Sequence, residues 1–309
     1  MGRRWRILLS AGALILAVAT LLVLGREAPL PPGLAGTLVF VSDRSGVESL
    51  HLRRLPRGRD RRLTSTSEPV RAPALSPDGA RVAFTMGGRL GLVSLDTEDV
   101  RMLTLGVDWR DDSPSWRPDG KAIVVSARRS AGTNAALHLL DLDAPEGGVA
   151  RHALTQTRGL DDLAPVFAPD GLSVVFVRED NLFRVSLADG RTVRLTGSFR
   201  RYRYARFLPS GRLVALWSQD KRFGLDAMDA DGRNLENLSE GPVSYRSVAP
   251  SPDGRYLAAT FAFDLGFHPT EALRPRKTEE VRLLDARGGA LGTLAGSWRY
   301  TNHSVDWGR

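Results

Sequence analysis

Two series of side chains that can bind ions or exchange protons recur at a fixed place in the sequence. Both stand shortly before a repeated five-residue motif that ends in Pro-Asp-Gly or a close variant. Five positions before the start of each of the five motifs, and five before Trp307 near the C-terminus, the first series is Val70, Asp111, Asp162, Tyr202, Tyr245 and Asn302. One position later, the second series is Arg71, Asp112, Leu163, Arg203, Arg246 and His303. Brought together, such groups can hold a metal ion, an acidic ligand or a peptide terminus.

Calcium is the metal considered for these positions, because Asp111, Asp112, Asp161 and Asp162 would supply hard oxygen ligands. The alternative is that the charges pair with one another, with water filling an otherwise empty pore. The resulting hypothesis is a ligand site without catalytic residues and without an assigned cofactor. Its members are Arg71, Asp111, Asp112, Asp162, Tyr202, Arg203, Tyr245, Arg246, Asn302 and His303.

Known catalytic patterns are missing from the sequence. None of the five histidines begins a His-Glu-x-x-His motif, and no Gly-x-Ser-x-Gly, Gly-Lys-Ser/Thr or Gly-x-Gly-x-x-Gly occurs. The chain has no cysteine, which excludes disulfides, Cys-ligated zinc, a thiol nucleophile and a lipidated cysteine. The sequence therefore predicts a protein that is not an enzyme.

The elements that would position these residues follow from internal repetition. The motif occurs at Leu75–Gly79, Trp116–Gly120, Phe167–Gly171, Phe207–Gly211 and Pro250–Gly254, with steps of 40 to 51 residues. An apolar strand is predicted after each turn: Arg81–Thr85, Ala122–Ser126, Ser173–Val177, Leu213–Trp217 and Tyr256–Thr260. A second motif, Leu-Thr or a variant, keeps the same phase and begins at Leu63, Leu103, Leu154, Leu195, Leu238 and Leu294. This period is typical of β-propellers.

Each repeat predicts four strands, a to d, with Pro-Asp-Gly joining a to b and Leu-Thr following d. The segment from Gly36 to Gly46 resembles a strand b without a strand a before it, and Asn302 to Trp307 resembles the missing strand a. The prediction is an all-β, six-bladed propeller with four-stranded blades. Its ring is closed by the C-terminal strand joining the N-terminal blade, which hides the sheet edges.

The phrase from Phe40 to Gly46, the repeated Pro-Asp-Gly turns and the Leu-Thr ends together resemble the propeller of the TolB-like, WD40-like (PD40) repeat family. The resemblance covers about residues 36–309 and implies the fold. The N-terminal α/β domain of TolB has no counterpart in these residues, so the role of TolB with a peptidoglycan-associated lipoprotein is not carried over.

A single membrane anchor is predicted before the propeller. Residues Ile7–Gly25 are 19 in number and uncharged, about enough for a helix to span a hydrocarbon core of ~30 Å. Arg3, Arg4 and Arg6 precede this run, which favours a cytoplasmic N-terminus. The predicted domains are residues 1–26 as N-terminus and transmembrane helix, 27–35 as Pro/Gly linker and 36–309 as propeller. A cleaved signal peptide is the alternative.

Propeller topology puts the a–b and c–d turns on one face, which the anchor joins, and the b–c and d–a loops on the opposite, distal face. The net charge of +8 fits either an Arg-rich solvated surface or an anionic partner. A membrane-surface contact is proposed for Trp5, Arg53, Arg54, Arg57, Arg59, Arg61 and Arg62, with a solvated hairpin as the alternative for the arginines.

Two insertions lie in b–c loops, at Arg128–Ala135 and at about Phe263–Glu279. The second is a candidate partner contact through Phe263, Leu265, Phe267, Arg274, Arg276 and Lys277, or else a flexible excursion.

These features predict a non-catalytic scaffold subunit that docks on the extracytoplasmic side of a membrane protein complex of photosynthetic, respiratory or envelope type. Its partners would be integral membrane proteins, with an anionic lipid surface as a further contact and no nucleic acid. Its predicted location is the bacterial cytoplasmic membrane, with the propeller in the periplasm. The alternative is a calcium-dependent, lactonase-like hydrolase or a ligand sensor that uses the mouth of the channel.

Overall fold

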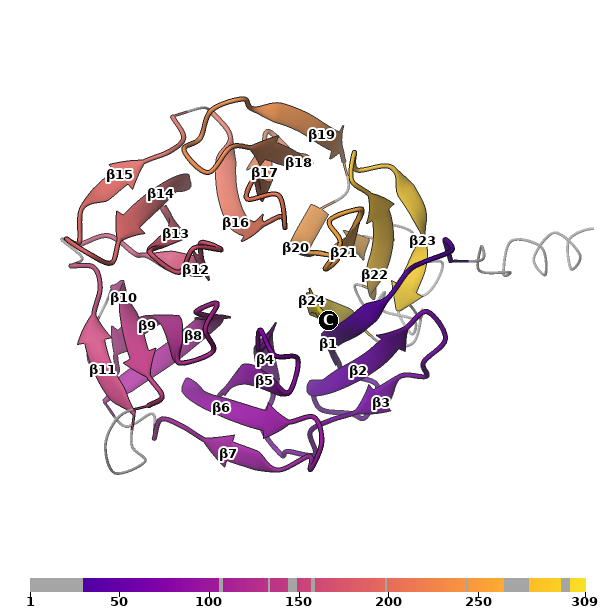
Figure 1. The fold of residues 1–309 in the computed structure, drawn as a ribbon, viewed down its shortest axis with the longest axis horizontal. Coiled ribbons are helices and arrows are strands. Elements are labelled where there is room, and N and C mark those ends of the chain that lie inside the picture. The colour runs from indigo at the N-terminus through magenta and orange to yellow at the C-terminus, as the bar shows by residue number, and fades with distance from the viewer. Residues whose placement is uncertain are drawn as a thin grey trace, which may run out of the picture.

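The computed structural model shows six four-stranded antiparallel sheets arranged as blades around a central channel (Figure 1). It describes residues 30–105, 108–132, 134–143, 149–156, 159–197, 199–242, 244–263, 278–295 and 301–309. The predicted fold class is confirmed for the propeller. The predicted transmembrane helix lies in residues 1–29, outside the described part. Within the described residues, no helix is long and apolar enough to cross a membrane.

Blades one to three follow the predicted order, with strand a innermost and strand d outermost. Blade one contains β24 (Asn302–Gly308), β1 (Gly36–Ser42), β2 (Ser49–Leu55) and β3 (Arg61–Arg62). Blade two contains β4 (Val70–Leu75), β5 (Arg81–Met86), β6 (Arg89–Ser94) and β7 (Val100–Met102). Blade three contains β8 (Trp109–Trp116), β9 (Ala122–Arg129), β10 (Ala135–Asp141) and β11 (Ala150–Ala153).

Blades four to six repeat the same arrangement. Blade four contains β12 (Leu163–Phe167), β13 (Ser173–Arg178), β14 (Asn181–Ser186) and β15 (Thr192–Arg194). Blade five contains β16 (Arg201–Phe207), β17 (Leu213–Gln219), β18 (Arg222–Met228) and β19 (Glu236–Gly241). Blade six contains β20 (Ser244–Pro250), β21 (Tyr256–Phe263), β22 (Thr278–Asp285) and β23 (Ala290–Ala295).

The C-terminal strand closes the ring as predicted. In Figure 1 the yellow β24 lies beside the indigo β1, with which it forms an antiparallel ladder from Thr37↔Gly308 to Ser42↔Asn302. The indole of Trp307 donates a hydrogen bond to the carbonyl of Ala35 at 3.1 Å. Blade one is thus assembled from both ends of the described chain.

The repeated Pro-Asp-Gly segments form tight turns between strands a and b. In each of four turns the aspartate side chain accepts a hydrogen bond from the backbone two residues later, as Asp119 does from Lys121 at 2.9 Å. The third residue has a positive φ, 70° at Gly79 and 71° at Gly120, a conformation that glycine adopts without strain. The predicted strands after the turns are confirmed, and all five continue one to three residues further.

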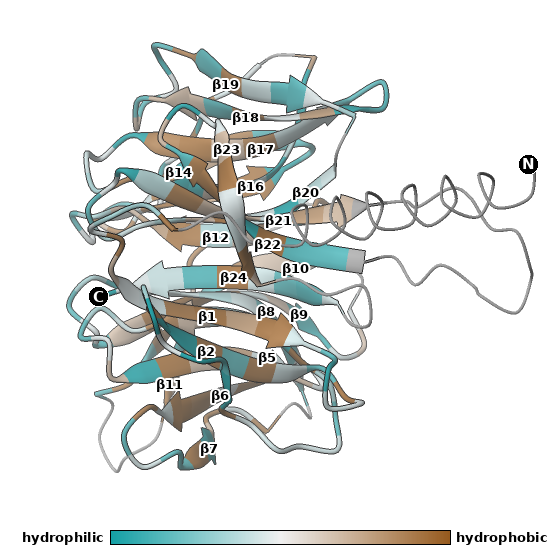
Figure 2. Cartoon of the chain, turned by 90° about the vertical axis from the view of Figure 1, so that its right-hand side faces the viewer, coloured by the Kyte–Doolittle hydropathy of each residue, from teal (hydrophilic) through white to brown (hydrophobic). Residues whose placement is uncertain are grey.

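The threonine of the Leu-Thr motif, which follows strand d, binds strand c of the same blade and helps to join neighbouring blades. Its hydroxyl accepts a hydrogen bond from a backbone N–H of strand c at 2.8 to 3.0 Å in blades one to four. Six clusters of buried apolar side chains lie between neighbouring blades. In Figure 2 the apolar stretches follow the strands while polar residues gather in the turns. The core is therefore a ring of inter-blade contacts rather than one central cluster.

A β-bulge interrupts the innermost strand of every blade. In four blades the bulged residue has a positive φ: Ala72, Ser113, Ala164 and Ser304. A regular strand presents every second residue to one side, whereas a bulge turns successive residues the same way. Each inner strand can therefore direct neighbouring residues into the channel.

The a–b turns mark the proximal face, and the described chain begins there. Arg255, beside the last Pro-Asp-Gly turn, lies against Gly33. The b–c and d–a loops form the distal face. The insertion in blade three joins β9 to β10 through residues 130–134, whereas Gly87 and Gly88 alone join β5 to β6. The insertion in blade six, residues 264–277, lies outside the described residues.

Candidate functional site: the two ends of the central channel

The distal end of the channel opens into a cavity of about 570 Å³. Its wall comes from the start of the inner strands, where the bulges lie, and from the loop that carries Glu48. Five of the six residues of the second predicted series line it: Arg71, Asp112, Arg203, Arg246 and His303. Leu163 is 40% exposed but does not line the cavity. A cavity of this size with convergent polar groups is a candidate binding site.

Most charged groups of this cavity form open ion pairs at its rim. Arg71 contacts Glu48 at 3.1 Å, and the same glutamate contacts His303 at 3.3 Å. Arg246 lies 3.5 Å from Glu279, and Arg203 lies 3.5 Å from Asp180. The three arginines of these pairs are exposed, so their pairing adds little to stability and their guanidinium groups remain accessible to a ligand.

The first predicted series needs a correction, because it does not line the cavity. Its members point between blades, and five are buried: Val70, Asp111, Asp162, Tyr202 and Asn302. The sixth, Tyr245, is hydrogen-bonded to Ser239 of the preceding blade at 2.6 Å. Residues of the two series are neighbours in the sequence, but their side chains point in different directions at the start of the bulged strand. The first series therefore lies between blades while the second faces the channel.

The buried acids of this series bind arginines and the Leu-Thr hydroxyls. Asp162 accepts hydrogen bonds from Arg178 at 2.6 and 2.8 Å and from Thr155 at 2.5 Å. Asp111 accepts hydrogen bonds from Arg151 at 2.8 Å and from Thr104 at 2.8 Å. Each carboxylate is thus paired within and across blades. These contacts stabilise the ring and leave no ready oxygen for calcium.

The described residues contain no group of three or more histidine, aspartate or glutamate side chains placed to hold a metal ion. Asp112 is exposed at the cavity, while Asp161 accepts a hydrogen bond from the backbone of Ala135 at 2.7 Å. The four aspartates considered for calcium are therefore divided between different environments.

Sequence analysis missed two charged groups at the middle of the channel, Arg206 and Asp306. The equivalent residues of the other blades are uncharged, namely Ala74, Ser115, Val166 and Ala249. A charged residue in this otherwise uncharged column is the sequence signal that could have revealed Arg206 and Asp306. The guanidinium of Arg206 stacks on the ring of Tyr204 at 4.2 Å. Asp306 accepts a hydrogen bond from the backbone of Leu75 at 2.7 Å, and burial raises the pKa of its carboxyl.

The proximal end of the channel is a second cavity, of about 410 Å³, and it has a different lining. Prolines of the a–b turns surround it, namely Pro77, Pro118, Pro169, Pro209 and Pro252. Leu75, Trp116, Phe167, Phe207 and Trp307 also contribute to its wall. Arg206 and Pro114 belong to the walls of both cavities. The channel is therefore polar at its distal end and mainly apolar at its proximal end.

No protein-family model matches the chain. Over 161 residues, 50% of this chain, it is 33% identical to the protein TolB homolog of Chlorobium luteolum. That match covers 35% of the relative, so the chain spans about a third of its length. The crystal structure of TolB from Acinetobacter baumannii is similar with a TM-score of 0.71 at 18% identity, covering 88% of this chain and 66% of that one.

The chain is a TolB-like propeller. An oligogalacturonate lyase in complex with manganese shares the fold more distantly, with a TM-score of 0.57 at 16% identity over 84% of this chain and 74% of that one. At that identity the likeness concerns the architecture alone.

The TolB-like propeller contains two buried histidines that sit at equivalent positions of strand c. His51 stacks on Phe40, with ring centroids 5.8 Å apart, and His138 lies against Trp109 at 4.4 Å. Burial, helped by Arg44 near His51 and by Arg151 near His138, lowers the pKa of each imidazole to about 4. Both histidines are therefore neutral in the folded protein at pH 7.

We expect the propeller to lose stability as the pH falls from about 6.5 to about 4. In this window the unfolded chain binds protons at His51 and His138 that the folded protein does not, so the free energy of unfolding decreases by up to about 1.4 kcal/mol per pH unit for each histidine. The hydrogen bond from Ser251 lowers the pKa of Asp253 to about 2. Protonation of this carboxyl therefore destabilises the fold only below the pH window of the two histidines. Denaturant unfolding at pH 7, 6 and 5 measures the slope.

Blade four supplies the variant for this measurement. Phe183 occupies the position of the two histidines and stacks on Phe176 at 5.9 Å. H51F/H138F should therefore fold and flatten the pH dependence, whereas replacement of the exposed His152 by Gln should leave it unchanged. An equal slope in H51F/H138F and the parent protein would refute the assignment.

The structure places the predicted basic turn on the proximal face, between β2 and β3. Arg54, Arg57 and Arg59 are exposed there. Arg61 and Arg62 are exposed as well, although Arg61 forms a salt bridge with Glu98 and Arg62 donates a hydrogen bond to the carbonyl of Thr64 at 2.6 Å. Arg53 is half-buried and donates a hydrogen bond to the carbonyl of Leu294. Trp5 lies outside the described residues.

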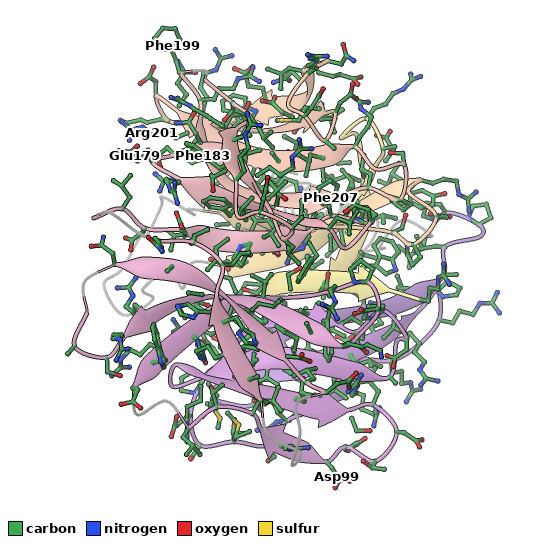
Figure 3. All side chains as sticks on the ribbon, turned by 60° about the vertical axis from the view of Figure 1, so that its left-hand side comes forward. Asp99, Glu179, Phe183, Phe199, Arg201 and Phe207 are labelled. Atoms are coloured by element: carbon green, nitrogen blue, oxygen red, sulfur yellow. The ribbon has the colours of Figure 1, made fainter. Side chains whose placement is uncertain are left out.

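The predicted partner loop of blade six is not described beyond its ends. Phe263 closes β21, and Leu265, Phe267, Arg274, Arg276 and Lys277 lie outside the described residues. The structure shows instead two exposed apolar side chains in d–a loops of the distal face, Leu105 at 81% and Phe199 at 93% exposure. Figure 3 shows Phe199 projecting from the molecule on the same side as Arg201. Each follows a Leu-Thr motif, a position that sequence analysis did not consider.

Proposed function

We propose that this TolB-like propeller is a non-catalytic protein-interaction subunit that docks with its distal face on a membrane protein complex. The observation that carries the proposal is the open distal cavity with its exposed arginines. The side chains of Arg71, Arg203 and Arg246 are 66%, 60% and 52% exposed. Leu105 and Phe199 add exposed apolar surface on the same face. Arginine and aromatic side chains are enriched at protein interfaces, and an acidic segment of the partner would complement the cavity.

The absence of a recognisable catalytic arrangement among the described residues favours binding over the hydrolase alternative. The buried acids Asp111 and Asp162 are bound to arginines, and the described residues offer no metal cluster. The similarity to a TolB homolog also supports a role in protein interaction.

The proposal places the protein at the extracytoplasmic side of the bacterial cytoplasmic membrane, anchored by its N-terminal segment. The described chain begins on the proximal face, where Arg54, Arg57 and Arg59 are exposed. Near an anionic surface each such arginine would add about 1 kcal/mol. The proximal face would then lie toward the lipid and the distal face toward the partner.

We expect a charge reversal at the cavity, R203E/R246E, to remove the partner. Both arginines pair with single, partly exposed carboxylates, so the variant should fold. Like charges facing an acidic partner segment should weaken the complex about tenfold or more. The measurement is a mild-detergent pull-down from native membranes, with co-purifying proteins quantified by mass spectrometry for the wild type and the variant.

Arg191 and Arg233, which are exposed on the proximal c–d turns, provide the control R191E/R233E with the same change of charge. This control should retain the partner. The anchor is tested with membranes that lack the partner: after a high-salt wash the full chain must remain in the pellet, while a chain beginning at Leu30 must not. A wild-type protein that runs as a lone monomer at native expression levels would refute the docking role, as would a partner that stays bound to R203E/R246E.

A further inference from the structure

The middle of the channel connects a polar cavity with a mainly apolar cavity, and one arginine lies at the connection. Arg206 lines the polar distal cavity and the mainly apolar proximal cavity. A molecule that fills both must carry an anionic or polar group near Arg206 and apolar groups beyond it.

The direct contacts of Arg206 are with neutral groups. Its guanidinium stacks on Tyr204 at 4.2 Å and donates a hydrogen bond to the carbonyl of Ala205 at 3.3 Å. It makes no salt bridge with a described residue, in contrast to Arg151, Arg178 and Arg200, which bind buried carboxylates. Arg206 is half-buried and lines both cavities, so a bound anion could reach its guanidinium and accept charge-assisted hydrogen bonds from it.

Asp306, on the inner strand β24, is the other charged residue at this level, and among the described residues it forms no salt bridge with Arg206. Its carboxyl already accepts the backbone N–H of Leu75. Burial raises the pKa of this carboxyl while the charge of Arg206 acts against the shift, so the two groups interact electrostatically without a salt bridge.

The proximal cavity is suited to an extended hydrocarbon group. Side chains of Leu75, Trp116 and Phe207 contribute to its wall, and the five turn prolines surround its opening. Its volume of about 410 Å³ falls in the range of small-molecule sites, which are lined mainly by apolar and aromatic groups.

We propose that the channel binds an anionic amphiphile, with its charged head at Arg206 and its single apolar tail in the proximal cavity. The binding of such a ligand does not depend on a protein partner, so this inference goes beyond the proposed function. A fatty acid and a single-chain anionic phospholipid share the required chemistry.

The test titrates the purified full chain with decanoate and with lysophosphatidylglycerol below their micellar concentrations, using calorimetry and tryptophan fluorescence. Trp116 and Trp307 line the tail cavity, so binding should change their emission. We expect saturable binding with a stoichiometry of one ligand per chain. The amphiphile with the lower dissociation constant identifies the preferred head group, carboxylate or phosphate. Decyltrimethylammonium, with the same tail and opposite charge, should bind at least about tenfold more weakly.

Two variants separate the head site from the tail site. R206A should weaken decanoate about tenfold or more, whereas R191A, on the exposed surface, should not change it. P169W places a large side chain at an exposed position of the proximal cavity wall and should weaken binding of both amphiphiles. Thermal unfolding establishes that each variant is folded. No saturable binding to the wild type, equal affinity in R206A, or equal affinity for the cationic amphiphile would overturn the proposal.

Discussion

A chain that ends at Thr301, and so lacks β24, is expected not to form the native propeller at 25 °C. Blade one would keep three strands, and β1 would lose its inner ladder. Val305 and Trp307, 1% and 6% exposed, would leave the apolar cluster between blades six and one. Truncating one buried tryptophan already costs about 3–5 kcal/mol, and a typical domain has only about 5–15 kcal/mol in total.

The measurement compares near-UV circular dichroism and thermal unfolding of the truncated and full chains. Removal of Arg309 alone, an exposed residue beyond β24, should change stability by less than about 0.5 kcal/mol. Addition of a synthetic peptide of residues 302–309 should restore the tertiary signal of the truncated chain. A truncated chain with the melting temperature of the full protein would show that closure by β24 is not required.

Replacing Asp162 by alanine is expected to destabilise the protein by about 3–5 kcal/mol. The carboxylate is fully buried and binds Arg178 and Thr155, so its removal leaves a largely buried guanidinium and a hydroxyl without their acceptor. The effect should appear as a lower midpoint of denaturant unfolding with an unchanged slope.

Asp180 supplies the matched control for this variant. It pairs with Arg201 at 3.8 Å and Arg203 at 3.5 Å, and its side chain is 39% exposed. Because Asp180 has a φ of 60°, the control is D180N, which keeps a side chain tolerant of this conformation and should cost no more than about 1 kcal/mol. In D162A/R178A the loss should be smaller than the sum of the two single losses, because both remove the same interaction. Additive losses, or a D162A cost near that of D180N, would contradict the role of this pair.

The fold could be predicted because its periodic parts depend on local chemistry. Pro-Asp-Gly determines a turn from three adjacent residues, and the Leu-Thr hydroxyl determines the neighbouring strand. The ends of strands were less predictable, since β9 continues through Arg129 although the apolar stretch ends earlier. Backbone pairing does not require apolar side chains, and the hydrophobic pattern therefore underestimates the strand.

The candidate site was predictable only in part, because its geometry depends on non-local features. The second series reaches the cavity, but the bulges turn the first series between the blades. The partners of the buried acids, among them Arg151 and Arg178, come from positions outside either series. Arg206 and Asp306 interrupt a column of small or apolar residues, a signal that spacing of motifs does not reveal.

The position of β1 between β24 and β2 has a mechanical consequence. A pull on the chain at Leu30 is transmitted to the proximal end of β1 and acts along the strand. The ladders on both sides, Gly36↔Leu55 to Ser42↔Ser49 and Thr37↔Gly308 to Ser42↔Asn302, are then loaded in shear. In shear the hydrogen bonds of a ladder share the load, whereas in peeling they break one after another. A tether attached at this point can therefore bear tension between a fixed surface and a load on the opposite face without opening the ring.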